Sequence, residues 1–493
     1  MNTLGIDIGT SSVKIALLGD DDHVIATASR PLDVSRPHPG WSEQDAQHWW
    51  TAIEQCFDEL HAAQAPAMSE VAAIGLSGQM HGATLLDAEG TVLRPCILWN
   101  DGRSGPQCER LTRDWPDLHA VTGNLAMPGF TAPKLMWVEQ HEPDVFRRVA
   151  RVLLPKDYVR LRLTGDAVSD MSDSAGTLWL DVGRREWSGA MLEATHLTRA
   201  HMPRLVEGSD ASGTLRPEIA QQLGLSASIV VAGGAGDNAA SAAGIGVAAP
   251  GTAFLSLGTS GVYFVANAAF SPNPARAVHA FCHAFPATWH QMTVMLSAAS
   301  ALRWLRHAVH ADSEAQLVDE AAALGDGASV PLFLPYLSGE RTPHNNAYAS
   351  GSFFGLTHDH TRAHLARAVL EGVAFAFLDG QQALLDGGAR IETVTLVGGG
   401  SRSALWAQIL ADTLGRTLDR RSGAEVGAAL GAARLGRLAC TGERVADVCI
   451  APPLADSFEP RAAHTEALAR RHDKFQRLYA ALAPEMTAAA QPI

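Results

Sequence analysis

The first eighteen residues are apolar and β-branched around a single polar break. The stretch from Leu4 to Leu18 is interrupted by Gly9-Thr10-Ser11-Ser12, a pattern typical of two short strands joined by a tight turn. Further along, a helical pattern over 44–60 alternates with short apolar runs at 71–76 and 229–232. Alternation of helices with short buried strands predicts an α/β protein.

The hairpin has a second copy, displaced by a fixed offset of 249 residues. The matched pairs are Ile6/Leu255, Ile8/Leu257, Gly9/Gly258, Thr10/Thr259, Ser11/Ser260 and Val13/Val262. After it come a long helical pattern at 365–385, an apolar run at 394–397 and another helical pattern at 404–414. Two unrelated hairpins could match by coincidence, but we favour an internal duplication, which predicts two domains of similar topology facing each other.

Composition places the boundary between these domains. Residues 233–252 are almost all Gly, Ala, Ser and Pro and lie just before the second copy. We therefore expect an N-terminal domain over 1–247 and a C-terminal domain over 248–440. The Ala-rich segment 441–493 is expected to be a partly helical peripheral extension.

Charge and cysteine usage narrow the function classes. The 493 residues are 47% apolar and 18% charged, as in a globular protein with room for two large cores. A net charge of -14 disfavours binding to nucleic acid or to an anionic membrane. The six cysteines form no C-x-x-C pair, so we expect neither a disulfide framework nor a zinc ribbon, and a cytoplasmic location. The sequence shows no targeting signal and no apolar run long enough to predict a membrane span.

The two turns offer groups that bind phosphate. Gly9, Thr10, Ser11 and Ser12 present backbone N–H groups and hydroxyls, with Lys14 as a nearby cation. Gly258 and Thr259 repeat the arrangement, so two facing turns could bracket the phosphates of one nucleotide. Asp7, at a strand end, could hold Mg²⁺, which prefers one or two carboxylates together with phosphate oxygens. Neither turn has the spacing of a Walker loop, and a lone Gly-Thr-Ser turn is more often only a turn.

Asp237 is the candidate catalytic carboxylate. It stands alone in Ala232-Gly233-Gly234-Ala235-Gly236-Asp237-Asn238, where small residues let backbone and ligand approach closely. Phosphoryl transfer to a hydroxyl needs positioning and a carboxylate that accepts the hydroxyl proton. The alternative is that Asp237 caps the Ala-rich helix after it, and the two roles are compatible.

Three further loops could contact ligands. Gly75 to Gly82, with Met80 and His81, follows a predicted buried strand, where α/β proteins bind ligands. Asp101 and Arg103 could hydrogen-bond several hydroxyls, or form a salt-bridged turn. The run Gly398-Gly399-Gly400, followed by Ser403, lies between a strand and a helix and could approach a base or ribose; its spacing is not that of a dinucleotide fold. His279, Cys282 and His283 lie in a strand-like stretch that scatters their side chains, so we treat them as structural.

With these segments in order, the chain resembles the FGGY carbohydrate kinases over nearly its whole length. Two more stretches are similar to signatures of that family: Gly129 to Trp137, and Gly351 to Leu356 followed by His364, Leu365 and Glu371. The resemblance implies two actin-like, ribonuclease H-like ATPase domains facing across a central cleft. It also implies transfer of a phosphoryl group from ATP, with Mg²⁺, to a small sugar.

Within the family, Ser77 to Ala83, Trp99 to Arg103 and Ser338 to Asn346 are most similar to the branch that phosphorylates D-xylulose. The glycerol branch carries Arg-Glu where Met80-His81 stand, which counts against glycerol. The resemblance implies that Asp237 is the catalytic base for the 5-hydroxyl and that Met80, His81 and Asn238 contact the sugar. It implies nucleotide contacts for Thr10, Ser11, Thr259, Gly399 and Ser403, and a place near the metal for Asp7.

Three alternatives remain at this stage. The substrate could be another ketose or polyol, such as ribulose or D-arabinitol. The protein could instead be an actin-like ATPase without a sugar, or a sugar-binding regulator that has lost catalysis. A homodimer is a further expectation.

Overall fold

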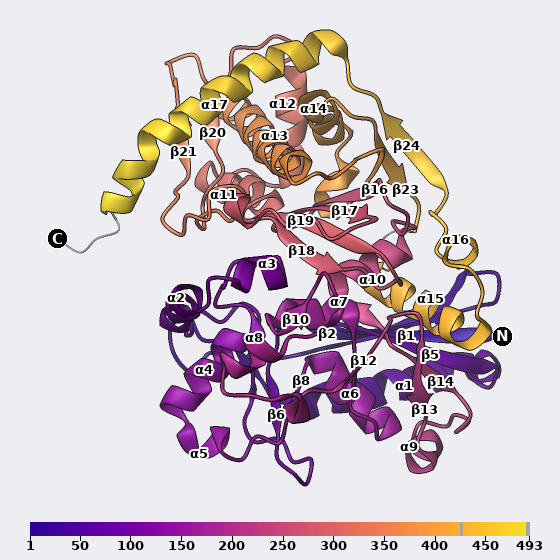
Figure 1. The fold of residues 1–493 in the computed structure, drawn as a ribbon. Helices are drawn as coiled ribbons and strands as arrows, with labels where there is room; N and C mark the ends of the chain where they lie inside the picture. Colours follow the sequence, from indigo (N-terminus) through magenta and orange to yellow (C-terminus); the bar gives the residue numbers. More distant parts are fainter. Residues whose placement is uncertain (424–426, 490–493) are drawn as a thin grey trace.

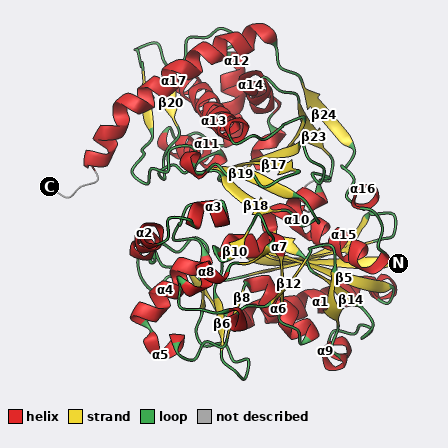
Figure 2. Cartoon of the chain, in the orientation of Figure 1, coloured by secondary structure: helices red, strands yellow, loops and turns green. Residues whose placement is uncertain are grey.

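The computed structural model describes residues 1–423 and 427–489, which form two lobes (Figure 1). In the figure the lower lobe, indigo to magenta, comes mainly from the first half of the chain, and the upper lobe comes mainly from the second. Each lobe contains one seven-stranded sheet. Figure 2 shows helices around both sheets, so the predicted α/β class is confirmed.

The sheet of the N-terminal lobe is built on the first hairpin. Its strand order is β13-β14-β5-β1-β2-β3, with β15 beside β5. The strands are β1 (Asn2–Ile8), β2 (Ser12–Leu18), β3 (Val24–Pro31), β5 (Val71–Gly78), β13 (Ala211–Thr214), β14 (Val230–Ala232) and β15 (Ala235–Gly236). β1 and β2 are antiparallel, and β5 runs parallel to β1.

The sheet of the C-terminal lobe repeats this plan. Its order is β18-β19-β17-β16-β22-β23-β24. The strands are β16 (Thr252–Leu257), β17 (Gly261–Asn267), β18 (His279–Cys282), β19 (Trp289–Met295), β22 (Thr393–Val397), β23 (Leu418–Arg421) and β24 (Leu454–Phe458). Here too the first two strands are antiparallel and the next neighbour, β22, is parallel to β16. The shared topology supports the duplication predicted from the offset.

Helices and short strand pairs complete the lobes. In the first half they are α1 (Ala46–Met68), α2 (Gly105–Asp114), α3 (Leu118–Thr122), α4 (Thr131–His141), α5 (Pro143–Phe146), α6 (Pro155–Thr164), α7 (Met171–Ser174), α8 (Gly189–Glu193), α9 (Pro217–Gln222) and α10 (Asp237–Gly244). The short pairs are β4 (Glu43–Gln44) with β7 (Cys96–Ile97), β6 (Thr84–Leu86) with β8 (Arg151–Leu153), β9 (Val168–Asp170) with β12 (Arg204–Val206), and β10 (Leu180–Asp181) with β11 (Glu186–Trp187).

The second half contributes α11 (Ala299–Ala308), α12 (Glu314–Ala323), α13 (Arg362–Asp386), α14 (Ala404–Leu414), α15 (Gly427–Thr441), α16 (Val445–Val448), α17 (Ala462–Ala489) and the pair β20 (Leu332–Leu334) with β21 (Ser352–Phe354). The predicted helices over 44–60, 365–385 and 404–414 are confirmed as α1, α13 and α14. A capping box at the start of α13, between Thr361 and His364, satisfies its first N–H groups. By length and composition α13 could cross a membrane, but 83% of its most apolar window is buried inside the protein, as in a core helix.

Helix α15 belongs to the second half in sequence but packs on the N-terminal sheet (Figure 1). Gly5 on β1 and Gly75 on β5 permit the close approach, because an added Cβ would lie 1.8 Å from Ala429 O and 1.7 Å from Ala432 O respectively. Gly431 of α15 likewise faces the backbone of α10, 1.8 Å from Ala240 O by the same measure. A helix from one half of the chain therefore covers the sheet of the other.

After α15 the chain returns to the upper lobe. β24 pairs with β23 at the sheet edge, and α17 packs on α13 and α14. The part of the segment that forms β24 and α17 is thus packed on the C-terminal lobe, whereas Val448 of α16 packs with Ala232 and Ala239 of the N-terminal lobe. The exact boundaries at 247 and 440 stay a prediction, because α15 separates chain order from spatial grouping.

A large apolar cluster joins the two lobes. It contains Phe130 and Trp179 from the first half together with Phe264, Phe281 and Met292 from the second. Burial of these large apolar side chains favours the association of the two lobes.

Candidate active site

The first hairpin places Asp7 at the end of β1. The Asp7 carboxylate accepts a hydrogen bond from Ser77 Oγ at 2.9 Å through one oxygen. Burial raises the pKa of Asp7, while the Ser77 hydrogen bond and the Lys14 charge oppose that shift. Lys14 stands directly opposite Asp7 in the β1–β2 register. The second carboxylate oxygen has no hydrogen-bond partner within residues 1–423 and 427–489, so it is free for a ligand.

Asp237 begins helix α10, one residue after the N-cap Gly236. Its Oδ1 accepts hydrogen bonds from the backbone N–H and the side-chain Nδ2 of Asn238, at 2.7 and 2.9 Å. Burial, and then the nearby negative charge of Asp7, raise the pKa of Asp237 to about 7. A carboxyl group with that pKa takes up and releases a proton near neutral pH, as a general base must. The capping interpretation of Asp237 is wrong, because Gly236 is the N-cap and no side chain caps α10; the role as catalytic base stays a prediction.

The strand segment before Asp237 is held by a buried ionic cluster. Lys156 Nζ lies 2.6, 2.7 and 3.1 Å from carboxylate oxygens of Asp157, Asp170 and Asp173, and these four side chains are 0% exposed. Asp170 accepts a hydrogen bond from Ser172 Oγ at 2.5 Å, and Ser172 Oγ accepts one from Gly236 N–H at 3.1 Å. The cluster is thus connected by hydrogen bonds to the residue before Asp237.

The cluster also contains Arg160, which pairs with Asp157 at 2.8 Å. Burial raises the pKa of Asp173 well above its usual range, and the Lys156 charge opposes that shift. Paired buried charges persist where each partner satisfies the other.

Met80 and His81 lie on the loop after β5, and Met80 contacts the residue before Asp237. Met80 packs on Gly236, where an added Cβ would lie 2.8 Å from Met80 Cγ. His81 has a left-handed backbone, with φ of 71°, and its Nδ1 lies 2.6 Å from the carbonyl oxygen of Gly176. Burial lowers the pKa of His81 to about 3, so the ring is neutral. Because the carbonyl accepts, Nδ1 carries the hydrogen and Nε2 is left as an acceptor.

Lys134 and Thr131, both on α4, hold the His81 backbone. Lys134 Nζ donates to the carbonyl oxygens of His81, at 2.9 Å, and Gly129, at 2.6 Å. Thr131 Oγ1 donates to the same His81 carbonyl at 3.1 Å. Lys134 is 0% exposed, and burial lowers its pKa to about 7. These bonds stabilise a backbone conformation that a residue with a Cβ adopts only rarely.

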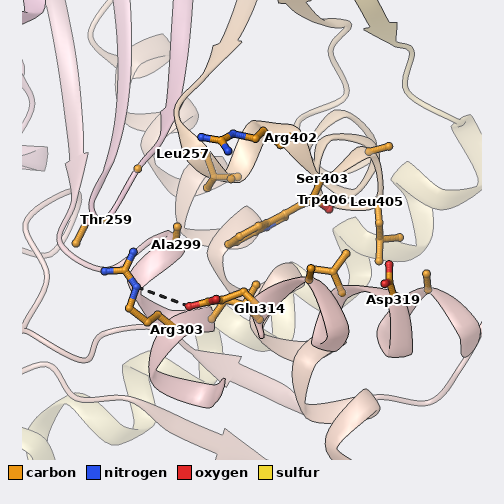
Figure 3. A pocket seen from close by; sticks show the side chains of 18 residues that line it. Leu257, Thr259, Ala299, Arg303, Glu314, Asp319, Arg402, Ser403, Leu405 and Trp406 are labelled. Atoms are coloured by element: carbon orange, nitrogen blue, oxygen red, sulfur yellow. Dashed lines mark hydrogen bonds and ion pairs between the residues drawn. The ribbon is translucent and has the colours of Figure 1, made fainter. Parts of the chain in front are cut away.

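A cavity of about 950 Å³ adjoins the second hairpin (Figure 3). Its lining includes five predicted nucleotide residues: Gly258, Thr259, Gly399, Gly400 and Ser403. Figure 3 shows Trp406 and Ser403 on one side and an ion pair between Arg303 and Glu314, with Nε and Oε1 3.8 Å apart, on another. The volume and the mixed lining suit a nucleotide.

Glycines bring the parts of this cavity together. Gly398 has φ of 91°, and an added Cβ would lie 2.8 Å from the Leu257 carbonyl. The loop after β22 therefore lies directly on the end of β16. Ser403 then caps α14, accepting from Trp406 N–H at 3.1 Å, which points the start of that helix toward the cavity.

A second cavity, of about 660 Å³, lies on the other side of the same loop. Gly398 and Ser256 line it from the C-terminal lobe, and Asn238 and Ser241 of α10 line it too. Asn238, next to Asp237, therefore faces the end of the second hairpin. The candidate base stands where the two lobes meet.

The first turn is less closely joined to the nucleotide cavity. Thr10, Ser11, Ser12 and Lys14 are not among the residues that line the 950 Å³ cavity. The Thr10 hydroxyl is already bonded, donating to Gln79 Oε1 at 3.1 Å and accepting from Trp99 Nε1 at 2.9 Å. Their phosphate contacts stay a prediction.

Asp101 and Arg103 form the salt-bridged turn rather than a free polar surface. The Arg103 guanidinium donates to both Asp101 oxygens, at 2.9 and 2.7 Å, and each side chain is 1% exposed. Arg103 also pairs with Glu43 and lies 3.5 Å above the Trp41 ring. These contacts favour the alternative of a salt-bridged turn, and a sugar contact for Asp101 and Arg103 stays a prediction.

Matches to known families decide how this arrangement is classified. The N-terminal domain of the FGGY family of carbohydrate kinases matches residues 2–244, and its C-terminal domain matches 253–440. The chain belongs to the FGGY family of carbohydrate kinases. Members are kinases that use ATP, and the two lobes are the actin-like domains of that family.

Three relatives illustrate the similarity. The chain is 51% identical to a xylulose kinase of Escherichia coli, covering 98% of this chain and 99% of the relative. A crystal structure described as a "xyloylose kinase" from Brucella ovis is 52% identical, with a TM-score of 0.96 over 98% of this chain and 100% of the other. A xylulose kinase structure from Rhodospirillum rubrum is 32% identical, with a TM-score of 0.93 over 99% and 100% of the two chains.

Several residues of the site were not found from the sequence. Ser172 and Lys156 carry no local motif signal, because their effect on Asp237 depends on contacts between distant segments. Lys134 lies inside the family signature Gly129 to Trp137, so its presence was noted without its bond to His81. Arg303 and Glu314 reach the cavity from two separate helices.

Proposed function

We propose that this chain transfers the γ-phosphoryl group of ATP to the 5-hydroxyl of D-xylulose, giving D-xylulose 5-phosphate and ADP. The observation that carries the proposal is the position of Asp237. Its pKa of about 7 and its place beside both Asp7 and the second hairpin suit a base between sugar and nucleotide. The similarity to curated xylulose kinases, at 51% identity over nearly the whole chain, supports the sugar.

In the proposed reaction, Asp237 accepts the proton of the 5-hydroxyl as that oxygen attacks the γ-phosphorus. Phosphoryl transfer depends mainly on positioning and on stabilising charge. The hydrogen bonds that connect Gly236 to Ser172 and the ionic cluster hold the backbone before Asp237, and the two bonds from Asn238 orient its carboxylate.

The nucleotide would occupy the 950 Å³ cavity. Gly399, Gly400 and Ser403 would contact the base and ribose, and Gly258 and Thr259 the phosphates, with Gly398 shaping the loop. Thr10, Ser11, Ser12 and Lys14 would meet the phosphates from the other lobe. We propose these roles on the basis of the cavity and of the matching hairpins.

Asp7 fits a magnesium site of the kind that kinases use. One of its oxygens is free, and the described residues contain no group of three metal-ligating side chains. Mg²⁺ is often bound through one or two carboxylates plus phosphate oxygens and water. When bound, the ion would neutralise charge on the phosphates.

The sugar would lie along Met80 and His81. His81 Nε2 can accept a hydrogen bond from a sugar hydroxyl, since Nδ1 is committed to Gly176. Asn238 would complete the contact next to Asp237, whose Oδ1 it already bonds.

A substrate panel tests the proposal. We expect ADP release with D-xylulose to exceed that with L-ribulose, D-arabinitol or glycerol in kcat/KM. If the enzyme prefers one of the other three compounds, that compound is the substrate and the assignment of D-xylulose is wrong. ATP hydrolysis at a similar rate without sugar would favour an actin-like ATPase. A cytoplasmic location and a homodimer stay predictions, which cell fractionation and light scattering would check.

A further inference from the structure

The segment from Ser338 to Asn346 has no role in the function described so far. It follows β20 in the C-terminal lobe and is fixed on both sides of Arg341. Glu340 Oε1 accepts from the N–H groups of Leu296 and Arg341, at 2.9 and 2.8 Å. Thr342 Oγ1 donates to Ala277 O at 2.9 Å. The backbone that carries Arg341 is therefore rigidly attached to the C-terminal sheet.

Arg341 extends from this loop to the contact between the lobes. Its Nη1 lies 3.2 Å from His279 Nε2, and His279 Nδ1 lies 2.9 Å from Asn124 Oδ1. Because a guanidinium only donates, His279 Nε2 accepts and Nδ1 carries the hydrogen that bonds Asn124. Asn124 belongs to the first half of the chain, so these three side chains join the lobes.

The same cluster reaches the sugar-binding loop. The His279 ring lies 5.7 Å from the Phe130 ring, which in turn lies 4.6 Å from the His81 ring. Phe281 stacks on His279 at 5.5 Å. Gly236, next to Asp237, contacts Met80, and Met80 precedes His81. His81 packs on Phe130, Phe130 packs on His279, and His279 bonds Arg341. Arg341 is therefore at the opposite end of this series of contacts from Asp237.

The guanidinium is left with unused donors. It carries five N–H groups, and within the described part of the chain its only side-chain hydrogen bond is to His279. No carboxylate of the described residues lies within ion-pair distance of Arg341. The adjacent Glu340 directs its Oε1 to the backbone N–H groups of Leu296 and Arg341 and forms no ion pair with the guanidinium. A partly buried charge without a partner is costly unless a ligand supplies acceptors.

We propose that Arg341 is a sugar-binding residue, which donates hydrogen bonds to the hydroxy-ketone end of the ketopentose, the end remote from the 5-hydroxyl. This inference rests on the proposed function. It places one determinant of sugar specificity on the C-terminal lobe, opposite Met80 and His81, so that a bound sugar contacts both lobes.

The first test compares Arg341→Met and Arg341→Lys with Arg362→Met, a surface control whose arginine pairs with Glu320. We expect the KM for D-xylulose to rise about 10- to 100-fold in Arg341→Met, as for the loss of one or two hydrogen bonds to a buried group. The KM for ATP should stay within about twofold, whereas a purely structural role would move both constants or neither. Arg341→Lys keeps the charge and should show a smaller rise.

The second test uses 1-deoxy-D-xylulose, which lacks the hydroxyl at the remote end. Wild-type enzyme should lose affinity for this analogue, and Arg341→Met should lose little further, because both changes remove the same interaction. An unchanged sugar KM in folded Arg341→Met, an equal rise in the KM for ATP, or equal losses for both sugars would each overturn the inference. If wild-type enzyme does not use D-xylulose at all, the proposed function fails instead. If Arg341→Met does not fold, the KM values for D-xylulose, 1-deoxy-D-xylulose and ATP are compared between Arg341→Lys and wild-type enzyme instead.

Discussion

The two hairpins share a backbone plan and differ in what they hold. The first has Asp7 where the second, 249 residues later, has Ser256. Asp7 stands beside Ser77 and Asp237, whereas the second turn borders the large cavity. The two hairpins thus have similar backbones but different side chains. Asp7 and Asp237 lie in the N-terminal lobe, and the large cavity lies in the C-terminal lobe.

The largest expected effect comes from removing the base in the carboxylate-bearing lobe. Asp237→Asn should lower kcat by about 10²- to 10⁴-fold, the usual contribution of a general base. Nucleotide affinity should be retained, because the other lobe lines the cavity. Steady-state kinetics and calorimetric titration with ADP would measure both. Asp166→Asn, an exposed carboxylate in the same lobe, is the matched control, and a kcat within tenfold of wild type would remove Asp237 from the base role.

The sheets also differ at the equivalent positions Gly5, in the first, and Phe254, in the second. Phe254→Ala should cost about 3–5 kcal/mol of unfolding free energy, because the ring stacks on Phe264 in the core. Gly5→Ala should cost about 1–3 kcal/mol or more for the opposite reason, since the added methyl group meets the backbone of α15.

Chemical denaturation would measure both changes. Gly189→Ala, where an added Cβ meets nothing within 4 Å, should be close to neutral. A neutral Gly5→Ala would show that α15 does not lie directly on β1.

The next effect concerns pH. With the pKa of Asp237 near 7, kcat/KM should fall about tenfold per unit as pH decreases below that value and level off above it. The base is active without its proton, so acid removes activity. Because the Asp7 charge contributes to the raised pKa of Asp237, the fall of kcat/KM should occur at lower pH in Asp7→Asn, whatever the effect on the maximum rate. A fall at the same pH in wild type and Asp7→Asn would show that the two carboxylates do not interact.

The smallest expected effect distinguishes the two threonines at equivalent places in the turns. Thr259 faces the cavity, and Thr259→Ala should raise the KM for ATP about 3- to 10-fold, the loss of about one hydrogen bond. The Thr10 hydroxyl is already bonded to Gln79 and Trp99, so Thr10→Ala should change the KM for ATP less and stability more. Equal effects on the KM for ATP would mean that both turns hold the phosphates alike.

Patterns local in sequence predicted the fold well. The hairpin around Gly9, the offset copy and the helix at 365–385 depend on the spacing of apolar residues, which the chain shows directly. The candidate base was found because Asp237 is the only charge in a run of small residues.

What the sequence could not show depends on contacts between distant segments. Asp101 and Arg103 suit a ligand site as well as a turn, and the contacts of Arg103 that favour the turn are with Glu43 and Trp41, about sixty residues earlier. The bond from Ser172 to Gly236 and the packing of α15 on β1 likewise have no spacing signal, because they join segments that the chain order keeps apart.

The route of the chain through α15 has a consequence for synthesis. The first 247 residues leave the ribosome before the helix that packs on Gly5 of β1 and Gly75 of β5 has been made, since α15 spans Gly427–Thr441. The N-terminal sheet therefore cannot complete its packing until α15 has been synthesised. A fragment that ends before α15 should be a poor folding unit and a natural client for chaperones.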